Sequence, residues 1–202
     1  MPDYSYENAA KECGFKYVCG VDEAGRGPLA GPVCAAAVIL PLGLEIEGLN
    51  DSKKLSEQKR EKLYGIITEK AIDYYVAFGS LEEIEKYNIL NATFLAMNRA
   101  INGLENVDFA IIDGNRTPKD IKVECATVVK GDAKSMSVAA ASILAKVTRD
   151  RLLLEYDKKY PLYEFAKHKG YGTKLHTDLI KKYGPCEIHR LSFLKNILGD
   201  RK

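Results

Sequence analysis

The sequence predicts an α/β domain in which short strands alternate with helices. Five apolar runs have the length and composition of strands, at residues 17–22, 32–40, 74–79, 107–112 and 123–129. Segments with apolar residues at helical spacing lie between and after them. With 202 residues, the chain is long enough for one domain with a substantial core. We therefore expect a main domain at residues 1–161 and a C-terminal helical extension at 162–202 that packs on it.

The first half of the chain is expected to begin with a hairpin. A short polar helix at about 3–12 precedes the first run, and the second run follows closely enough to pair with the first. Pro41 and Gly43 then interrupt the pattern. A helix from about Ser56 comes next, with apolar positions at Leu63, Ile67 and Ala71.

Three more helices are expected further along the chain. Ser80 and Glu83 have the spacing of a capping box, and the helix that they open should end near Gly103. Its apolar stripe is expected in the core and consists of Leu90, Phe94, Met97 and Ile101. Residues 136–160 form a second helix, whose small residues allow a close approach to the sheet and which ends before a proline. A third is expected at about 174–183.

Composition is that of an ordinary globular protein. Hydrophobic residues make up 46% and charged residues 29%, and no apolar run approaches the roughly 20 residues that cross a bilayer. The N-terminus lacks the basic and apolar regions of a signal peptide, so a cytoplasmic location is expected. The five cysteines lie far apart without a CxxC pair, which predicts buried reduced thiols and neither disulfides nor a zinc site. A net charge of +2 permits a nucleic-acid partner without arguing for one.

Two adjacent carboxylates, Asp22 and Glu23, end the first strand. Acids crowded in this way repel one another, and a divalent cation is the simplest means of neutralising them. Gly25, Arg26 and Gly27 follow at once, and their glycines let the backbone approach a polar ligand beside a fixed cation. The segment predicts a metal site joined to a loop that contacts a phosphate-bearing polymer. Taken alone, the acidic pair fits a tight turn with solvated acids better, and the rest of the chain reverses this preference.

Further carboxylates follow the fourth and fifth strands. Asp113 ends the fourth, and Asp132 comes after the fifth. If the first, fourth and fifth strands run parallel, their carboxyl ends lie along one edge of the sheet, where the acids can meet. Four oxygen ligands suit Mg²⁺ or Mn²⁺, and two such ions about 3.5–4 Å apart can promote phosphodiester hydrolysis. Taken singly, Asp113 is typical of a turn and Asp132 of a helix cap.

Several motifs resemble, in their order and spacing, those of ribonuclease HII, the bacterial type 2 ribonuclease H. They are GVDEAGRGPLAGPV, DSKKLS, IIDGN, VKGDAKS with AAASILAKVTRD, and HKGYGT. The resemblance covers about residues 17–195 and implies a ribonuclease H-like fold, with a mixed five-stranded sheet flanked by helices and a C-terminal helical extension. The chain departs from the family pattern at Glu187, where a proline is expected, and this difference concerns the geometry of the local loop.

The resemblance also implies an activity and a set of site residues. Members of the family cut the RNA strand of RNA/DNA hybrids and incise duplex DNA 5′ of single ribonucleotides, leaving a 3′-hydroxyl and a 5′-phosphate, with two Mn²⁺ or Mg²⁺ ions. The implied catalytic and metal-binding residues are Asp22, Glu23, Asp113 and Asp132. The implied substrate-binding residues are Gly25, Arg26, Gly27, Tyr171, Lys53 and Lys146. Among these, Tyr171 corresponds to the tyrosine that packs on the sugar at the junction between RNA and DNA.

Two other functions stay open at this point. Ribonuclease HIII shares the fold, but typically has a glutamate where this chain has Asp132 and carries an additional N-terminal domain. A catalytically silent nucleic-acid-binding module would use the same groove. Lys53 also fits an ordinary solvated surface, and His168 is expected to make a loop or phosphate contact. We expect a monomer, and nothing in the sequence specifies a contact with a replication clamp.

Overall fold

A mixed sheet forms the centre of the protein. The computed structural model describes residues 1–199, except for the side chain of Lys54. In this part of the chain five strands pair in the order β3-β2-β1-β4-β5, and they are β1 (Val18–Ala24), β2 (Val33–Ile39), β3 (Asp73–Gly79), β4 (Phe109–Asp113) and β5 (Glu124–Val128). β2 is antiparallel to β1 and β3, whereas β1, β4 and β5 run parallel. The predicted mixed five-stranded sheet is confirmed.

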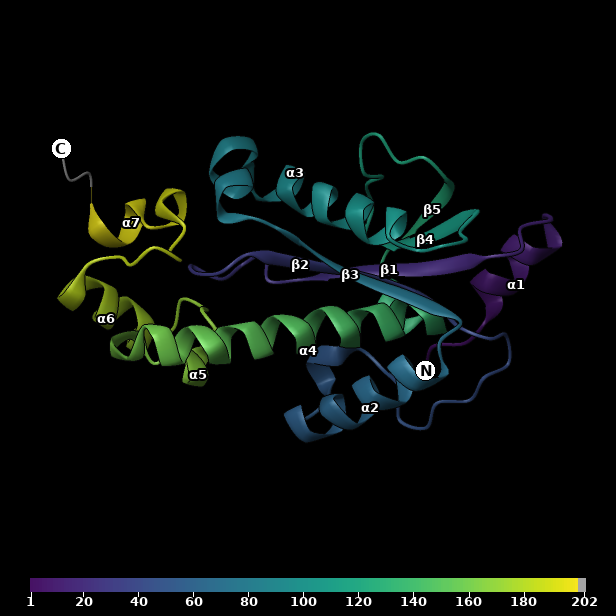
Figure 1. The fold of residues 1–202 in the computed structure, drawn as a ribbon, viewed down its shortest axis with the longest axis horizontal. Coiled ribbons are helices and arrows are strands. Elements are labelled where there is room, and N and C mark those ends of the chain that lie inside the picture. Colours follow the sequence, from purple (N-terminus) through teal and green to yellow (C-terminus); the bar gives the residue numbers. More distant parts are fainter. Residues whose placement is uncertain (200–202) are drawn as a thin grey trace.

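Helices cover both faces of this sheet (Figure 1). α3 (Leu81–Asn102) lies on one face and α4 (Met136–Lys159) on the other, with α2 (Glu57–Lys70) packed beside α4. Successive residues of β2 point to opposite faces, so Ala35 belongs to the core beneath α3 and Ala36 to the core beneath α4. The sheet therefore separates two apolar layers.

β1 and α4 approach each other closely. A Cβ atom on Gly20 of β1 would overlap the backbone of Ser137 and Val138 at the start of α4. The next turn of the helix is also made of small, fully buried residues, namely Ala139, Ala140 and Ala141. The small residues predicted to face the sheet thus bring α4 directly onto the strand that carries Asp22.

The N-terminal helix α1 (Ser5–Glu12) lies at one end of the sheet (Figure 1). Its Glu7 is buried, and one carboxylate oxygen accepts hydrogen bonds from the Ser135 hydroxyl at 2.7 Å and from the Ser137 N–H at 2.9 Å. Ser135 also caps α4 by accepting a hydrogen bond from the Val138 N–H. A long-range polar contact therefore fixes the point at which α4 begins.

Local sequence signals place the ends of two helices correctly. Ser56 caps α2, and Ser80 and Glu83 form both halves of the capping box that opens α3. α3 ends at Asn102, immediately before Gly103. These ends depend on short-range hydrogen bonds, which is why they can be read from the sequence.

The apolar stripe of α3 is only partly in the core. Met97 and Ile101 are buried as predicted, whereas Leu90 and Phe94 are half-buried. The helical path also breaks at Asn88, whose φ of 70° lies in the left-handed region. Because of this break, residues before and after Asn88 do not share one continuous helical face.

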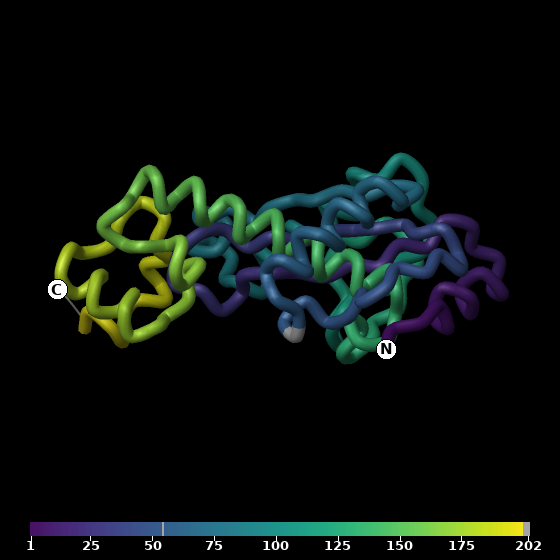
Figure 2. The backbone as a smooth tube through the Cα atoms, turned by 90° about the horizontal axis from the view of Figure 1, so that it is seen from below, coloured from purple at the N-terminus to yellow at the C-terminus, as the bar shows by residue number. Residues whose placement is uncertain are grey.

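After α4 the chain forms a C-terminal lobe at the end of the molecule opposite α1 (Figures 1 and 2). Its helices are α5 (Phe165–His168), α6 (Lys174–Tyr183) and α7 (Lys195–Leu198). Tyr163 and Phe165 of the lobe pack with Ala30, from the loop after β1, and with Leu153 of α4. The division into domains at residue 161 stays a prediction, and residues 200–202 of the predicted extension lie outside the described part of the chain.

Two expectations from composition can be compared with the structure. No helix within residues 1–199 has both the length and the apolar character that a bilayer crossing requires. All five cysteines are free thiols, so the expected absence of disulfides agrees with the structure. Cys19 and Cys34 are buried, and burial raises the pKa of both thiols. Cys13 is exposed just after α1, and the prediction of burial is wrong for this residue.

Candidate active site

The parallel strands bring the predicted acids to one edge of the sheet. Asp22 and Glu23 lie near the carboxyl end of β1, and Asp113 is the last residue of β4. Val21 pairs with Ile112, so the residues that follow on these two strands are neighbours. Asp132 lies beyond β5 on a short helical turn, where the N–H of the adjacent Gly131 donates to Asp113 Oδ1 at 2.7 Å. The four acids therefore gather as the strand order predicts.

The gathered carboxylates disfavour one another's ionised forms. Burial raises the pKa of Asp22 well above its usual value, and the charges of Glu23 and Asp113 raise it further. Burial also raises the pKa of Glu23, against the opposing effect of Arg26, whose Nη1 lies 3.3 Å from Glu23 Oε1. For Asp132, burial raises the pKa, and Asp51 and Asp113 add to this effect. A nearby cation would stabilise the ionised form of these carboxylates.

Lys53 is one such cation. Burial acts to lower the pKa of its ammonium group, but the carboxylates of Asp22 and Asp132, followed by those of Asp51 and Asp113, outweigh burial, and the pKa is raised. A raised pKa means that the acids stabilise the protonated amine. Lys53 is therefore placed as a counter-ion to the acidic cluster as well as in the wall of the adjacent pocket.

The donor set fits a divalent ion by its chemistry. Its members are four carboxylates without sulfur or imidazole, which is the hard, all-oxygen set that Mg²⁺ and Mn²⁺ prefer. As they are placed in the described part of the chain, however, no three Asp, Glu, His or Cys side chains converge closely enough to hold one ion. The acids share one edge of the sheet without forming an assembled metal centre.

A pocket of about 470 Å³ opens beside the acids. It brings together residues from distant parts of the sequence: Glu23, Ala24, Gly25, Arg26, Gly27, Ser52, Lys53, Ile89, Ser142, Lys146, Tyr171 and Phe193. All six residues predicted to bind substrate line this pocket. Glu23 also lines it and is one of the four acids. One continuous surface therefore runs from the acids to the glycine loop and Tyr171.

Tyr171 and Lys146 face each other across part of the pocket wall. The ammonium group of Lys146 lies 5.7 Å from the centre of the Tyr171 ring, and it also donates a hydrogen bond to Asp150 Oδ1 at 2.7 Å. The Tyr171 side chain is 42% exposed. A flat aromatic face that is open to solvent and flanked by a cation suits a sugar next to a phosphate.

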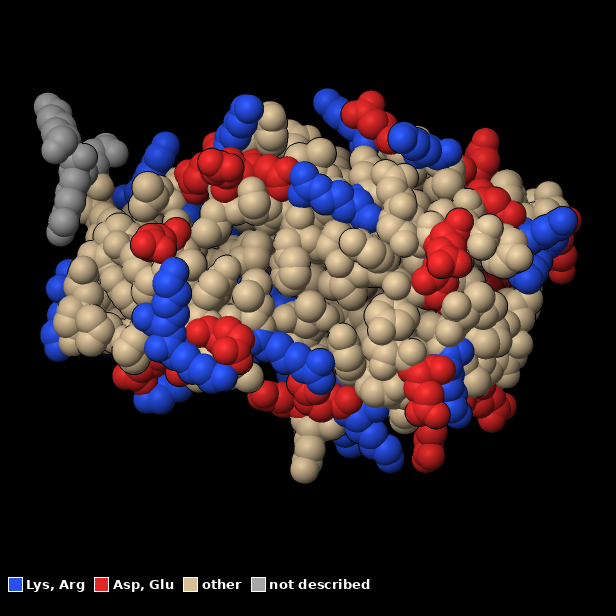
Figure 3. Space-filling view, in the orientation of Figure 1, with Lys and Arg blue, Asp and Glu red and all other residues tan. Residues whose placement is uncertain are grey.

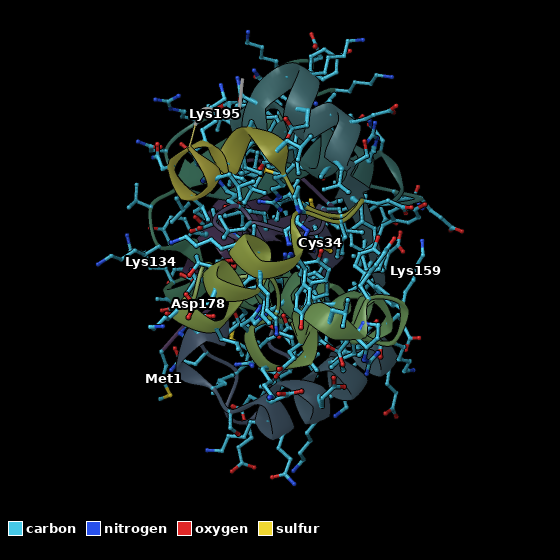
Figure 4. The ribbon with its side chains drawn as sticks, turned by 90° about the vertical axis from the view of Figure 1, so that its left-hand side faces the viewer. Met1, Cys34, Lys134, Lys159, Asp178 and Lys195 are labelled. Carbon is cyan, nitrogen blue, oxygen red and sulfur yellow. The ribbon has the colours of Figure 1, made fainter. Side chains whose placement is uncertain are left out.

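The face of the molecule seen in Figure 3 carries charged side chains of both signs. Basic and acidic side chains alternate over the face seen in Figure 3, in keeping with a net charge of +2. Around the C-terminal lobe, Lys159, Asp178 and Lys195 point outward, whereas Cys34 lies inside behind the lobe (Figure 4). Attraction of an anionic ligand must therefore depend on local groups rather than on overall charge.

Comparison with known proteins identifies the family. Residues 19–196 match the sequence model of the family described as Ribonuclease HII. The chain belongs to the ribonuclease HII family. A ribonuclease HII from Acetivibrio thermocellus is 58% identical over 194 residues, which cover 96% of this chain and 75% of that protein. Membership confirms the resemblance found in the motifs and makes the chain a type HII ribonuclease H, a hydrolytic nuclease.

Solved structures agree with the ribonuclease H fold. The ribonuclease H2 from Pyrococcus horikoshii OT3 superposes with a TM-score of 0.74 at 30% identity, covering 91% of this chain and 97% of that one. Bst-RNase HIII in complex with Mn²⁺ superposes with a TM-score of 0.73 at 19% identity, covering 92% of this chain and 69% of that one. The second likeness concerns the fold alone.

The candidate site also includes polar residues that sequence patterns did not reveal. Ser142 of α4 hydrogen-bonds to Asp22, which partly offsets the rise in the pKa of that acid. The Ser142 hydroxyl lies 2.9 Å from the Ser52 hydroxyl, and both serines are 3% exposed. Asp51, next to Ser52, lies close enough to Asp132 to affect its pKa. The only available signals were a serine within the alanine run of α4 and the DSKKLS motif itself.

The histidines of this ribonuclease HII family member form a buried cluster. His168 is 7% exposed, its Nε2 donates to the Tyr163 carbonyl at 2.8 Å, and its ring stacks on His176 at 4.1 Å between centroids. His176 Nε2 lies 3.0 Å from His189 Nε2. Burial lowers the pKa of both His176 and His189 to about 4, so these rings are neutral at neutral pH. Of the two contacts expected for His168, the structure shows the loop contact, since its Nδ1 also accepts a hydrogen bond from the Gly170 N–H at 3.2 Å.

Glu187, which departs from the ribonuclease HII pattern, lies on the surface. It accepts a hydrogen bond from the Tyr160 hydroxyl at 2.7 Å and an ion pair from Lys159 at 3.3 Å, both at the end of α4. The neighbouring turn is closed instead by Cys186 and His189, since the Cys186 N–H donates to His189 Nδ1 at 2.9 Å and the His189 N–H to the Cys186 carbonyl at 3.0 Å. Loop closure here does not require a proline at this position.

Proposed function

We propose that the chain hydrolyses the RNA strand of RNA/DNA hybrids and incises duplex DNA 5′ of single ribonucleotides, leaving a 3′-hydroxyl and a 5′-phosphate. The main support is the position of the acidic cluster next to a pocket lined by the Gly25–Gly27 segment and Tyr171. The 2′-hydroxyl distinguishes RNA from DNA, and a loop beside the acids can test for it where cleavage occurs. Contacts to sugars and phosphates carry no base information, so cleavage should be independent of sequence. Ribonucleotide removal from DNA and RNA primer removal are the corresponding roles.

Two divalent ions, Mn²⁺ or Mg²⁺, complete this proposal. The residues that would hold them are Asp22, Glu23, Asp113 and Asp132. Bound ions of this kind orient and ionise an attacking water and stabilise the leaving oxygen. The protein contributes the repulsion among its acids, which a cation relieves, and the hydrogen bond from Ser142 that orients Asp22. Lys53 places a further positive charge next to the cluster.

Recognition of the substrate is assigned to the pocket wall. The side chain of Arg26 is 50% exposed and can reach a phosphate, while the glycines on either side let the strand approach the backbone. Tyr171 would pack on the sugar and present its hydroxyl, and Lys146 beside it would neutralise a neighbouring phosphate. These roles would explain why the pocket wall combines an aromatic ring, cationic side chains and exposed glycine backbone.

Incision of a duplex that contains one ribonucleotide tests the proposal most directly. With Mn²⁺ or Mg²⁺ we expect a single cut on the 5′ side of the ribonucleotide, and mapping of both product ends should give a 3′-hydroxyl and a 5′-phosphate. Tyr171→Phe and Tyr171→Ala should both lower the rate while leaving metal binding intact. Binding without cleavage would favour the silent nucleic-acid-binding module, and cleavage of long hybrids without cutting at single ribonucleotides would favour a ribonuclease HIII-like specificity.

The two glycines of the loop should respond differently to substitution. A Cβ on Gly27 would meet no atom within 4 Å, so Gly27→Ala should change the free energy of unfolding by less than about 0.5 kcal/mol. We nevertheless expect cleavage to fall about tenfold or more, because the added methyl group would occupy space needed by the substrate. Steady-state cleavage and thermal unfolding of the same preparations measure both effects.

Gly25→Ala is the matched comparison. Gly25 has a φ of 95°, and its Cβ would overlap the side chain of Arg149, so this variant should lose about 1–3 kcal/mol of stability together with its activity. Wild-type cleavage by Gly27→Ala would show that the backbone at this position does not contact the substrate.

Other expectations stay predictions. They are the monomeric state, the cytoplasmic location, and a catalytic domain at residues 1–161 with an extension at 162–202. No residue described here assigns a contact with a replication clamp.

A further inference from the structure

Arg190 is a buried cation whose acceptors are carbonyl groups. It precedes the short turn Leu191–Phe193 in the C-terminal lobe, and it is 0% exposed. Its Nε donates to the Gly31 carbonyl at 2.8 Å, its Nη1 to the carbonyls of Arg26 at 2.9 Å and Pro28 at 2.8 Å, and its Nη2 to the Gly25 carbonyl at 2.6 Å. One guanidinium group thus binds four carbonyls of the loop that lines the candidate substrate pocket.

Arg149 of α4 continues this arrangement on the adjacent backbone. It is 1% exposed, and it donates from Nη2 to the Ala30 carbonyl at 2.9 Å and from Nε to the Pro32 carbonyl at 3.1 Å. Its Nη1 donates to the Lys169 carbonyl at 3.1 Å, two residues before Tyr171. Arg149 therefore links the end of the glycine loop to the turn that carries the tyrosine.

Main-chain hydrogen bonds complete the link between loop and lobe. The Leu29 N–H donates to the Gly170 carbonyl and the Arg190 N–H donates to the Leu29 carbonyl, each at 2.8 Å. The Gly31 N–H donates to the Ile188 carbonyl at 2.8 Å. The loop is consequently held on its inner side almost entirely by residues of α4 and the lobe.

Burying two guanidinium groups near each other is costly unless their donors are satisfied. Burial, followed by the charge of Arg149, lowers the pKa of Arg190 to about 9, so Arg190 is still charged at neutral pH. Seven backbone carbonyls accept hydrogen bonds from the pair. Removal of Arg190 would leave four of these carbonyls without this donor, so the group fixes the conformation of the loop as well as contributing to stability.

We infer that Arg190 is a positioning residue for ribonucleotide recognition. By binding the carbonyls of residues 25, 26, 28 and 31, it keeps their negative oxygens inside the protein and away from the place where a phosphate would bind. Its charge, together with that of Arg149, places two positive charges on the buried side of the loop. The inference rests on the proposed role of the Gly25–Gly27 segment in substrate binding.

Arg190→Lys is the main test, because lysine keeps the charge but cannot reproduce the forked donors that reach four carbonyls. On a duplex with one embedded ribonucleotide we expect kcat to fall about tenfold or more and KM to change less than about threefold, since misplacement of the scissile bond affects the reacting geometry more than binding. Assays run well below the melting temperature, with folding verified by circular dichroism.

Chemical rescue distinguishes positioning from general support of the fold. Arg190→Ala assayed with added ethylguanidinium should recover a large part of the lost kcat. The matched control is Arg151→Ala, which removes a surface arginine paired with Glu61 and should neither lose activity nor respond to the additive. If the alanine variant does not fold, the lysine variant decides the question by its kcat.

The possible outcomes separate this inference from the proposed function. If the wild-type protein does not cut the substrate, the proposed function fails. Suppose that the wild type cuts and that Arg190→Lys folds. If the kcat of this variant is within threefold of the wild-type kcat, or if only its KM rises, the positioning role of Arg190 is wrong while the proposed function stands. A folded alanine variant that ethylguanidinium does not rescue also counts against the positioning role.

Discussion

Asp22→Asn should abolish cleavage and, in the absence of metal, make the protein more stable. The loss of activity is expected to be about a thousandfold or more, because the acid that would hold the metal ions is removed. The gain in stability follows from the raised pKa of Asp22. An acid whose pKa is higher in the folded than in the unfolded chain destabilises the folded state when ionised, by about 1.4 kcal/mol for each unit of difference, and asparagine removes this cost at neutral pH.

Cleavage assays and thermal unfolding in EDTA measure both parts of this result. Asp108→Asn is a suitable control, because Asp108 precedes β4 and contacts the residues before β1, at the end of that strand opposite the acidic cluster. Its carboxylate accepts hydrogen bonds from the Lys16 N–H at 2.7 Å and the Tyr17 N–H at 2.8 Å. The same substitution there should retain activity and lower stability. If Asp22→Asn unfolded at a lower temperature than the wild type in EDTA, the electrostatic cost assigned to the acidic cluster would be wrong.

Gly20→Ala should prevent the protein from folding stably. The new methyl group would overlap the backbone of Ser137 and Val138, and neither β1 nor α4 can move aside without opening the core. Overpacking a core lowers the free energy of unfolding by about 1–3 kcal/mol when neighbouring side chains can shift. Here the overlap is with backbone, which cannot shift in this way, so the loss should be larger and comparable with the total stability of a small domain.

Soluble yield and urea unfolding of Gly20→Ala provide the measurement. Gly65→Ala is the matched control, because Gly65 lies within α2 and a Cβ there would meet no atom within 4 Å. Alanine at that position should raise stability by about 0.5–1 kcal/mol through its better helix propensity. A Gly20→Ala protein with wild-type unfolding behaviour would mean that β1 and α4 are less closely packed than described.

Sequence reasoning located the acidic residues because their positions depend on regular structure. Asp22 lies near the carboxyl end of β1 and Asp113 ends β4, and the parallel pairing of these strands brings the two positions together. The capping box at Ser80 depends on residues three apart, so it too could be read locally. Features with a fixed relation between spacing and geometry were therefore predictable.

Features that depend on distant backbone were not predictable in this way. Arg190 binds carbonyls about 160 positions earlier in the chain, and a carbonyl acceptor leaves no trace in the side-chain sequence. For His168 the sequence left a loop contact and a phosphate contact open for a related reason, since the burial of its ring depends on how the lobe folds around Phe165. The break of α3 at Asn88 arises from a backbone conformation that asparagine adopts but does not require. In each case the outcome depends on tertiary contacts, which local sequence patterns do not specify.

The spacing of Ser142, Lys146 and Arg149 on α4 has a consequence for how this chain tolerates changes in length. Intervals of four and three residues place these side chains along one side of the helix, from the acidic cluster to the lobe. One residue inserted between Ser142 and Arg149 would rotate everything beyond it by about 100° and displace it by about 1.5 Å. Loops such as 41–50 can absorb insertions, but α4 sets the separation between Ser142, beside the acidic cluster, and Lys146 and Arg149, beside the turn that carries Tyr171, and should keep its residue count.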